Sequence, residues 1–395
     1  MKVVLLYHRY VERIRKFSDP AKTNNAGTAG RGGKHMKKKY EVLASWILDE
    51  IENGTLRYQE RIPSEKDLAE KFGVSRQTVR RALEELADKG IVEGRRGSGT
   101  YVAVNTRRHP GDEIRIAVML TYVDTYIFPA IIKGMESVLS GEGCALQIAV
   151  SGNAVEKERM LLNEFIRTRS VDGLIAETVK SGLPNPNLKL YGKLQDSGVP
   201  VLFVNSFYRE LDIPHVSMDD RRAGYLAARH LLECGHTQIG GIFKADDGQG
   251  HLRYAGYTDA LMEKEIKIRG GRITWIDSEE IGEMEDESRR ILKRLDGCTA
   301  CVCYNDEIAY NLVNILKKAG KRVPEDISVT GIDNSVLAEF CPVPLTSLKN
   351  PVEELGRAAA RKMTGCILRG EKMETEEFEP ELVMRNSVRV ISEVT

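Results

Sequence analysis

The sequence contains no uninterrupted apolar run long enough to span a bilayer, and aromatic residues make up only 6% of its 395 residues. Because a transmembrane helix needs about 20 mostly apolar residues, we expect no membrane insertion. The seven cysteines are an odd number, scattered from Cys144 to Cys366, and no secretory signal precedes them. This usage indicates reduced thiols, and we therefore expect a cytoplasmic protein.

The chain also lacks a net charge, but its charges are unevenly distributed. Basic residues exceed acidic ones by six in residues 1–35 and by three in residues 36–108, whereas acidic residues exceed basic ones by nine in residues 109–395. A basic front and an acidic rear indicate that any polyanion binds at the front. The length exceeds what one hydrophobic core supports, which predicts two or more cores.

Residues 18–35 show neither a helical nor an alternating apolar period, which predicts a disordered leader over residues 1–35. The segment 27–34 is glycine-rich but not a phosphate loop, because His35 follows Lys34 where that motif requires Ser or Thr. The ordered pattern starts directly at Met36. We therefore hypothesise that the leader reflects an overlong start-site assignment.

Residues 36–104 carry the signals of three helices and a hairpin. Apolar residues recur at helical spacing over 40–51, and Ser64 with Asp67 forms a capping-box pattern for a second helix that Gly73 ends. Ser75 is expected to cap a third helix. Two β-favouring pieces, 91–92 and 100–102, flank a glycine-rich stretch with a basic tip. The pattern predicts a winged helix-turn-helix domain, followed by a linker over residues 105–113.

The motifs at 62–65 (Ile-Pro-Ser-Glu), 72–76 (Phe-Gly-Val-Ser-Arg) and 97–102 (Gly-Ser-Gly-Thr-Tyr-Val) resemble the GntR family of winged-helix regulators. The resemblance implies binding to double-stranded operator DNA. A recognition helix places its first turn in the major groove, where Arg can fork onto guanine and Gln onto adenine. An alternative is a helical adaptor domain with a solvated basic face. The candidate DNA contacts are Lys39, Glu65, Ser75, Arg76, Gln77, Thr78, Arg80, Arg95, Arg96 and Gly97.

From residue 114 onward, short buried strands alternate with helical segments. This alternation predicts parallel sheets wrapped by helices, and the length of 114–395 suits two doubly wound α/β lobes better than one. A late helix over 352–368 is expected to pack between lobes or between protomers. The expected strands are 114–120, 145–150, 173–176, 199–204, 239–243, 273–276, 300–303 and 328–332, and the expected helices include 129–140, 157–167, 221–232, 254–264 and 306–318.

The motifs at 230–236, 253–257, 304–309 and 323–334 resemble the LacI/GalR sensor domain, which has the periplasmic-binding-protein fold. The combination of this sensor domain with a GntR-type N-terminal domain is similar to that of the arabinose-responsive AraR repressors of Gram-positive bacteria. The resemblance implies a homodimeric repressor of carbohydrate-utilisation genes that a small sugar releases from DNA. L-arabinose is the expected sugar, and a different sugar is the alternative.

Sugars present hydroxyls and apolar ring faces, so their sites combine charged planar groups with aromatic walls at strand ends. Tyr126 and Phe128 are alternatively core residues, and Glu177 and Asn205 alternatively cap turns. Asp306 is expected to be an N-cap rather than a ligand. Arg253, Asn305 and Asp333 are the main effector-binding candidates, and the secondary ones are Tyr122, Asp124, Tyr126, Phe128, Glu177 and Asn205.

The alternatives to a regulator are a sugar-handling enzyme and a module that binds a protein. A sugar-handling enzyme with a regulatory domain is disfavoured, because the chain lacks a phosphate loop, a dinucleotide fingerprint after a strand and a nucleophile–base signature. The alternative that the sensor recognises a protein rather than a sugar stays open. Cys298, Cys301 and Cys303 lie in or beside an expected buried strand without a histidine at zinc-ligand spacing, so we expect small buried thiols, no metal and no cofactor.

Overall fold

The structure is a computed structural model and describes residues 38–52, 55–56, 60–95, 97–103 and 113–391. The expected leader, residue Arg96 and most of the expected linker lie outside these ranges. The chain divides into two compact units, residues 1–113 and 114–395. Within the described ranges, every helix is too short or too polar to cross a membrane.

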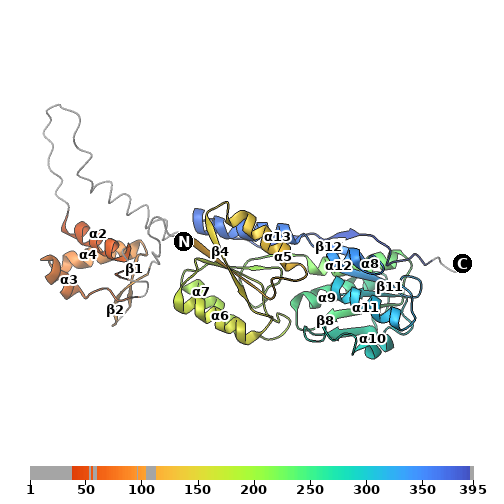
Figure 1. Cartoon of the computed structure of the whole chain (residues 1–395). Coiled ribbons are helices and arrows are strands. Elements are labelled where there is room, and N and C mark those ends of the chain that lie inside the picture. The colour runs from red at the N-terminus through yellow and green to blue at the C-terminus, as the bar shows by residue number, and fades with distance from the viewer. Residues whose placement is uncertain (1–37, 53–54, 57–59, 96, 104–112, 392–395) are drawn as a thin grey trace. The chain divides into compact units, whose positions relative to one another are not determined.

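In its described residues, the N-terminal unit has the helices α2 (Lys39–Glu52), α3 (Glu65–Phe72) and α4 (Arg76–Asp88) and a hairpin of β1 (Val92–Arg95) and β2 (Gly99–Val102) (Figure 1). The predicted capping box is confirmed, because Ser64 Oγ accepts the Asp67 N–H while Asp67 Oδ2 accepts the Ser64 N–H. Gly73 ends α3 with φ 59°, a left-handed conformation that favours glycine. Local signals therefore set the boundaries of these helices.

The hairpin is antiparallel and pairs Val92 with Val102 and Arg95 with Gly99. Buried apolar side chains from all three helices and from the hairpin form one core. The predicted winged helix-turn-helix fold is confirmed. The largest of these side chains are Leu43, Ile47, Ile51, Ile62, Leu68 and Leu86.

The first lobe of the second unit holds a parallel sheet in the order β13-β7-β6-β5-β3-β4. Helices α5 (Phe128–Leu139) and α13 (Val352–Thr364) cover one face, and α6 (Val155–Thr168) and α7 (Leu188–Asp196) cover the other (Figure 1). The strands are β3 (Ile114–Leu120), β4 (Cys144–Val150), β5 (Gly173–Ala176), β6 (Val201–Val204), β7 (His215–Met218) and β13 (Glu376–Phe378).

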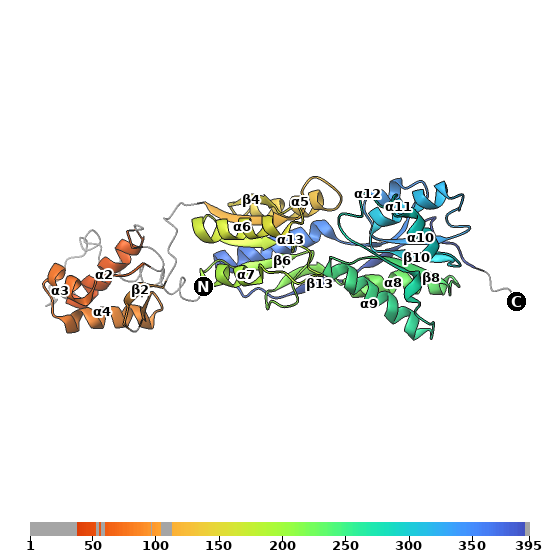
Figure 2. The same ribbon diagram turned by 90° about the horizontal axis from the view of Figure 1, so that it is seen from below.

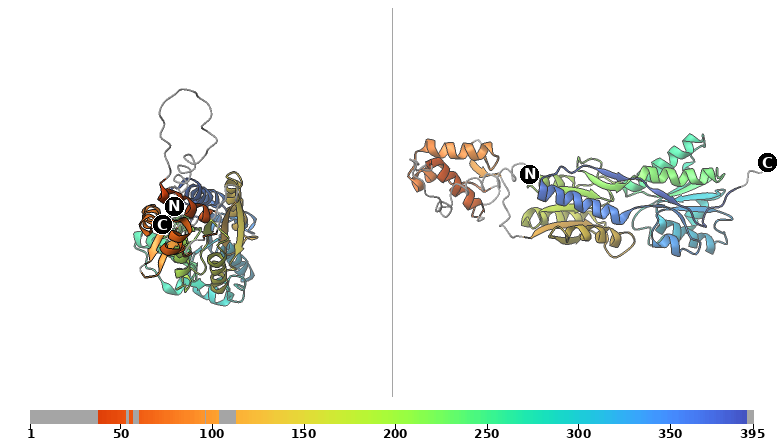
Figure 3. Two further views of the ribbon diagram at one scale, coloured as in Figure 1. Left: turned by 90° about the vertical axis from the view of Figure 1, so that its left-hand side faces the viewer. Right: turned by 90° about the horizontal axis from the view of Figure 1, so that it is seen from above.

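Helix α13 packs inside this lobe, so our expectation that it lies between the lobes was wrong, and its packing between protomers stays a prediction. It runs beside α5, as Figure 3 shows. A Cβ atom on Gly134 would lie 2.1 Å from Glu353 O, and one on Gly356 would lie 2.1 Å from Ile131 O. The two helices touch backbone to backbone because both contact positions are glycine. A π-helical turn, η3 (Gly365–Arg369), follows α13.

The second lobe has the sheet order β14-β12-β11-β10-β8-β9, in which the pair β12–β14 is antiparallel and the other pairs are parallel. Helices α8 (Asp220–Glu233) and α9 (Gly248–Glu263) cover one face, and α10 (Ser288–Arg294), α11 (Asp306–Lys318) and α12 (Val336–Phe340) cover the other (Figure 2). The strands are β8 (Ile239–Lys244), β9 (Ile273–Ile276), β10 (Ala300–Cys303), β11 (Ser328–Asp333), β12 (Thr346–Lys349) and β14 (Glu381–Val383), and a short 3₁₀ helix, η2 (Gly270–Arg272), precedes β9.

The chain passes between the two lobes at residue 219, at residues 350–351 and at residues 379–380. The predicted class of two doubly wound lobes is confirmed by these two sheets with helices on both faces. Because parallel strands end at the same edge of a sheet, the carboxyl edge of each lobe collects the residues that follow its strands.

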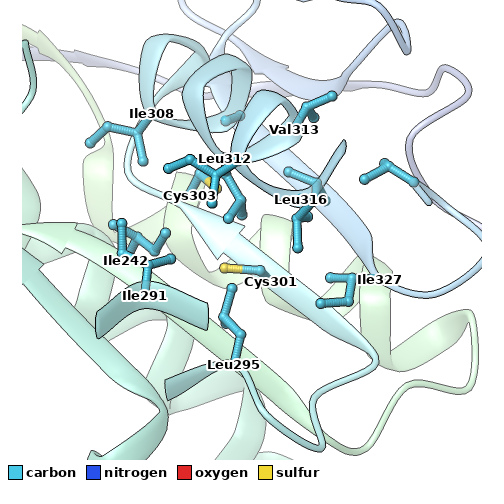
Figure 4. Close-up of a cluster of buried hydrophobic side chains, with 14 of the residues drawn as sticks. Ile242, Ile291, Leu295, Cys301, Cys303, Ile308, Leu312, Val313, Leu316 and Ile327 are labelled. Atoms are coloured by element: carbon cyan, nitrogen blue, oxygen red, sulfur yellow. The ribbon is translucent and has the colours of Figure 1, made fainter. Parts of the chain in front are cut away.

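The cysteines of β10 belong to the core of the second lobe. Figure 4 shows Cys301 and Cys303 among Ile242, Leu295 and Leu312. All seven cysteines are thiols rather than halves of disulfides, and Cys298, Cys301 and Cys303 are buried. Within the described part of the chain, no cluster of His, Cys, Asp or Glu side chains has the arrangement of a metal site. The expectation of buried thiols in this strand is confirmed.

Candidate recognition helix and interlobe pocket

The first turn of α4 is organised by its N-cap. Ser75 Oγ accepts the Thr78 N–H at 3.2 Å and lies 2.9 Å from Thr78 Oγ1. Arg76 and Gln77 follow directly and are exposed. The remaining unpaired N–H groups and the positive end of the helix dipole favour an anion such as a phosphate at this turn. The predicted cap is confirmed, and the side chains of Arg76 and Gln77 are exposed at this turn.

Arg80 lies one turn further along α4 and pairs with Glu65, the first residue of α3. Its Nε lies 3.1 Å and 2.9 Å from the two carboxylate oxygens of Glu65. The two side chains are 64% and 37% exposed, so the pair contributes less than about 1 kcal/mol to stability. The Arg80 guanidinium can therefore leave Glu65 at a cost below about 1 kcal/mol.

The hairpin and the start of α2 carry the remaining basic candidates. The Arg95 guanidinium lies 4.4 Å from the centre of the Tyr101 ring and 2.5 Å from Glu93. Gly97 is exposed, with φ 75°. Lys39 is the exposed first residue of α2. Of the ten candidate DNA contacts, Arg96 lies outside the described residues.

A pocket of about 560 Å³ lies between the two lobes, at the carboxyl edges of both sheets. The strands β3, β5 and β6 of the first lobe and β8, β10 and β11 of the second lead directly into it. Asp124 is exposed and lies outside the lining. The irregular segment 121–127 has no alternation, and the sequence therefore could not show which of its side chains face the pocket. The lining includes the other eight candidates, Tyr122, Tyr126, Phe128, Glu177, Asn205, Arg253, Asn305 and Asp333.

Arg253 is the most buried charged group of the pocket, with 1% of its surface exposed. Its guanidinium donates to Asp220 at 2.8 Å, to Asp333 at 3.3 Å and to the Tyr304 carbonyl at 2.6 Å. Burial raises the pKa of Asp220 to about 6, although Arg253 opposes this shift. The guanidinium thus holds two buried carboxylates, and Arg253 is among the residues that line the cavity.

The sequence motifs indicated Arg253 and Asp333 but not Asp220, the other carboxylate that pairs with Arg253. Helix α9 begins at Gly248, six residues before the expected start, because Asp247 caps it by accepting the Gln249 N–H at 3.0 Å. Because glycine has a low helix propensity, Gly248 and Gly250 gave no sign of a helix in this first turn. Asp220 is the first residue of α8, and its proximity to Arg253 depends on the packing of α8 against α9.

Asp333 also links the two lobes. The Tyr126 hydroxyl donates to Asp333 Oδ2 at 2.6 Å, and Asn350 Nδ2 donates to Asp333 Oδ1 at 3.2 Å. Tyr126 has φ 56° and packs at the margin of the first-lobe core. Phe128 begins α5, is 7% exposed and lies edge-on to Tyr122 at 5.8 Å. Both aromatic residues are therefore packing residues and pocket residues at once.

Glu177 joins the ends of three strands rather than capping a turn. It accepts the Thr121 N–H at 2.9 Å, the Thr121 hydroxyl at 2.5 Å and the Asn205 amide at 2.7 Å. Burial raises the pKa of Glu177, and these hydrogen bonds oppose the shift. Asn205 has φ 65°, and its buried Oδ1 has no hydrogen-bond partner in the described structure. That oxygen can accept a hydroxyl from a bound molecule.

The N-cap of α11 is Asn305, so the expectation that Asp306 caps this helix was wrong. Asn305 Oδ1 accepts the Ile308 N–H at 3.0 Å. Asp306 instead lies inside the lobe, where it accepts the Ser335 N–H at 2.6 Å and the Ser347 hydroxyl at 2.5 Å. Burial, followed by the charge of Asp333, raises the pKa of Asp306 to about 7.

Several polar residues that line the pocket or form hydrogen bonds across it were not predicted. Asn153 Nδ2 donates to Ser278 Oγ at 2.6 Å, and Ser278 Oγ donates to Asp246 Oδ2 at 2.7 Å. Asp246 Oδ1 is buried and has no partner in the described structure. The sequence could have indicated Asp246 as a pocket residue, because residues 245–247 directly follow β8. The other unpredicted polar lining residues include Lys180, Ser181, Lys244, Asp247, Gln249 and Glu307.

Comparison with known proteins covers both units. Residues 39–102 match the model of bacterial regulatory proteins of the gntR family, and residues 228–388 match the periplasmic binding protein-like domain. The arabinose metabolism transcriptional repressor of Halalkalibacterium halodurans is 37% identical over 364 residues, 89% of this chain and 97% of that protein. The protein of the same name from Geobacillus stearothermophilus is 35% identical and covers 91% and 98%.

Solved structures resemble the second unit. The transcription regulator CcpA of Lactococcus lactis has a TM-score of 0.63 at 26% identity and covers 70% of this chain and all of that one. A LacI family transcriptional regulator from Enterococcus faecium with bound ribose has a TM-score of 0.60 at 25% identity, with the same coverage. These relatives are transcription regulators, not enzymes.

Proposed function

This chain belongs to the bacterial transcriptional repressors of sugar metabolism that join a gntR-type DNA-binding domain to a periplasmic binding protein-like sensor, and we propose that L-arabinose is its effector. In this proposal residues 36–104 bind the operator, residues 105–113 link the domains, and residues 114–395 bind the sugar. L-arabinose then releases the repressor from DNA. The names of the relatives from Halalkalibacterium halodurans and Geobacillus stearothermophilus support this choice of sugar.

The observation that carries the proposal is the charge pairing in the pocket. Lys180 lies 3.4 Å from Glu279, Lys244 lies 3.5 Å from Asp247, and Arg253 pairs with two aspartates. Each cation that lines the described pocket therefore already has a carboxylate partner. A phosphorylated or otherwise anionic ligand would meet excess negative charge, whereas a neutral sugar can donate hydroxyls to carboxylate and amide oxygens.

The unpartnered oxygens support the same class of ligand. Asn205 Oδ1 and Asp246 Oδ1 are buried acceptors on opposite lobes, and a ligand with several hydroxyls can satisfy both. Such a ligand favours the state in which the lobes are close, since it donates to both of them. Buried polar atoms gain most from a partner when water is excluded.

Release requires that sugar and operator prefer different states of the repressor. A coupling of about 1–3 kcal/mol is typical, and it must weaken sugar binding by the same factor when operator is bound. For the DNA side we assign base contacts to Arg76, Gln77 and Arg80. Lys39, Glu65, Ser75, Thr78 and the hairpin residues Arg95, Arg96 and Gly97 are assigned to the DNA backbone or to positioning.

We also propose a homodimer that reads a two-fold symmetric operator in the cytoplasm. Phe340, on α12, is an apolar side chain that is 78% exposed, and we assign it to the contact with a second copy. Phe340→Asp should convert the dimer to monomers in light scattering and weaken operator binding. A dimer that survives this change would place the interface elsewhere.

The test of the effector is a fluorescence-anisotropy titration of repressor bound to its native operator. L-arabinose, D-xylose, D-ribose, D-galactose and D-ribose 5-phosphate are added separately at fixed salt. We expect release by L-arabinose and none by the phosphate ester. Release by another sugar would correct the identity of the effector, release by the phosphate ester would contradict the charge argument, and release by none would refute the sugar proposal.

A further inference from the structure

A buried carboxylate in the first lobe holds a cluster of polar side chains that the pocket description leaves unused. Glu158, on α6, is 0% exposed. The hydroxyls of Tyr191 and Tyr208 donate to its Oε1 at 2.6 Å and 2.7 Å, and the amides of Asn185 and Asn187 donate to its Oε2 at 2.9 Å and 2.8 Å. Four donors thus converge on one carboxylate.

The cluster reaches a segment of irregular backbone, residues 177–187, which connects β5 to α7. The Tyr208 oxygen accepts the Val179 N–H at 2.9 Å and lies 2.8 Å from the Val179 carbonyl oxygen. Asn185, within the same segment, lies 2.7 Å from the Tyr208 oxygen. Tyr208 therefore supplies the hydrogen-bond partner of the Val179 N–H in this segment.

The other side of the segment forms the pocket wall and touches the second lobe. Thr178, Lys180 and Ser181 line the pocket. Ser181 Oγ accepts the Gly248 N–H at 3.1 Å, and the Gly182 N–H donates to the Asp246 carbonyl at 3.1 Å. A shift of Val179 would move residues on either side of it that face the ligand and the opposite lobe.

We propose that the Tyr208 hydroxyl is a positioning group for effector binding, because it fixes segment 177–187 in the conformation that completes the pocket and meets the second lobe. Tyr208 acts through this segment and does not itself line the pocket. The inference rests on the proposed function, since it assumes that the pocket binds an effector.

The chemistry of the cluster fits a fixed rather than a switching role. Burial beside Glu158 raises the pKa of both Tyr208 and Tyr191, so both hydroxyls remain protonated and continue to donate. The rings of Tyr191, Phe203 and Tyr208 lie within 6 Å of one another in tilted and edge-on contacts. Tyr→Phe keeps these contacts and removes only the hydroxyl.

Two substitutions separate positioning from general stability. Tyr208→Phe removes one donor to Glu158 and also leaves the buried Val179 N–H without its partner. Tyr191→Phe removes an equivalent donor to Glu158, the partner that the Tyr191 hydroxyl has in the described structure. The second variant is therefore the matched control, because it weakens the same cluster without touching segment 177–187.

The experiment uses the full-length repressor and its variants. L-arabinose affinity is measured by calorimetry, and operator affinity is measured by fluorescence anisotropy without sugar. The rate of amide hydrogen exchange at residues 178–182 is also measured without sugar. We expect Tyr208→Phe to weaken sugar binding by about 5- to 100-fold, the range for a buried donor left unpaired in the bound state. Its exchange should be faster at residues 178–182 and its operator affinity unchanged, while Tyr191→Phe should match the wild type in all three measurements.

The outcomes distinguish the two proposals. If Tyr208→Phe binds L-arabinose as well as the wild type does, or if Tyr191→Phe weakens binding and speeds exchange equally, the positioning role is refuted. If the wild-type protein binds no L-arabinose, the proposed effector fails instead. The exchange comparison between the two variants still decides whether Tyr208 fixes the segment.

Discussion

Replacing Arg80 with alanine tests whether α4 reads bases. Arg80 and its neighbour Arg81 lie on the same helix and carry the same charge, but they point to different partners. Arg80 pairs with Glu65 of α3, whereas the Arg81 guanidinium lies 4.4 Å from the centre of the Tyr40 ring. Arg81→Ala is therefore the control for the loss of one positive charge and for the change in helix propensity.

The expected magnitudes follow from exposure. Both arginines are exposed, and each substitution should lower the free energy of unfolding by less than about 1 kcal/mol. A bidentate contact between arginine and guanine contributes about 1–3 kcal/mol of base discrimination, roughly 5- to 150-fold in affinity. Arg80→Ala should lose this amount on the operator but not on random duplex. Arg81→Ala should weaken both DNAs by a similar, smaller factor.

The assay is anisotropy on operator and random duplex across a range of salt concentrations. Salt dependence reports the number of phosphate contacts, whereas the ratio of the two affinities reports base contacts. Equal losses from Arg80→Ala on both DNAs would show that Arg80 contacts only phosphates. A simultaneous loss of sugar binding would indicate misfolding rather than a lost base contact.

Three further predictions concern stability and coupling. Ser75→Ala should lower the free energy of unfolding of the N-terminal unit by about 1 kcal/mol in urea denaturation, because it removes the cap of α4. Tyr126→Phe should weaken sugar binding about tenfold in calorimetry and leave operator binding unchanged, because its hydroxyl donates to Asp333 across the lobes. Because burial raises the pKa of Asp306 to about 7, the folded protein binds this proton more tightly than the unfolded chain; the free energy of unfolding should rise as pH falls from 8 to 5, and Asp306→Asn should flatten that rise.

Local elements were predicted well where their signals lie within a few residues. The predicted strands 114–120, 173–176, 273–276 and 300–303 and the helix 306–318 have the same limits in the structure. The short strands β7, β12, β13 and β14 were missed. Each of these strands has at most two apolar residues, whereas the predicted four-residue strands 173–176, 273–276 and 300–303 have at least three, and the missed strands are defined by the neighbours with which they pair.

The pocket was predicted in part because strand ends can be read from a sequence. Eight of the nine effector candidates line it, but their partners were not predicted. Nothing near Arg253 in the sequence indicates Asp220, which lies 33 residues before it, or Asp333, which lies 80 residues after it. Two helices, α8 and α9, and the strand β11 must pack before these three charges meet.

The sequence by itself determined the order of the two units, the helix caps of the DNA-binding unit and most residue types at the pocket edge. These features depend on hydrogen bonds and apolar periods that extend over a few residues. The tertiary structure alone decided which carboxylate neutralises each cation and how Glu158 and Tyr208 support the pocket wall. Burial removes water from those groups only after distant segments have packed, and their interactions therefore have no local signal in the chain.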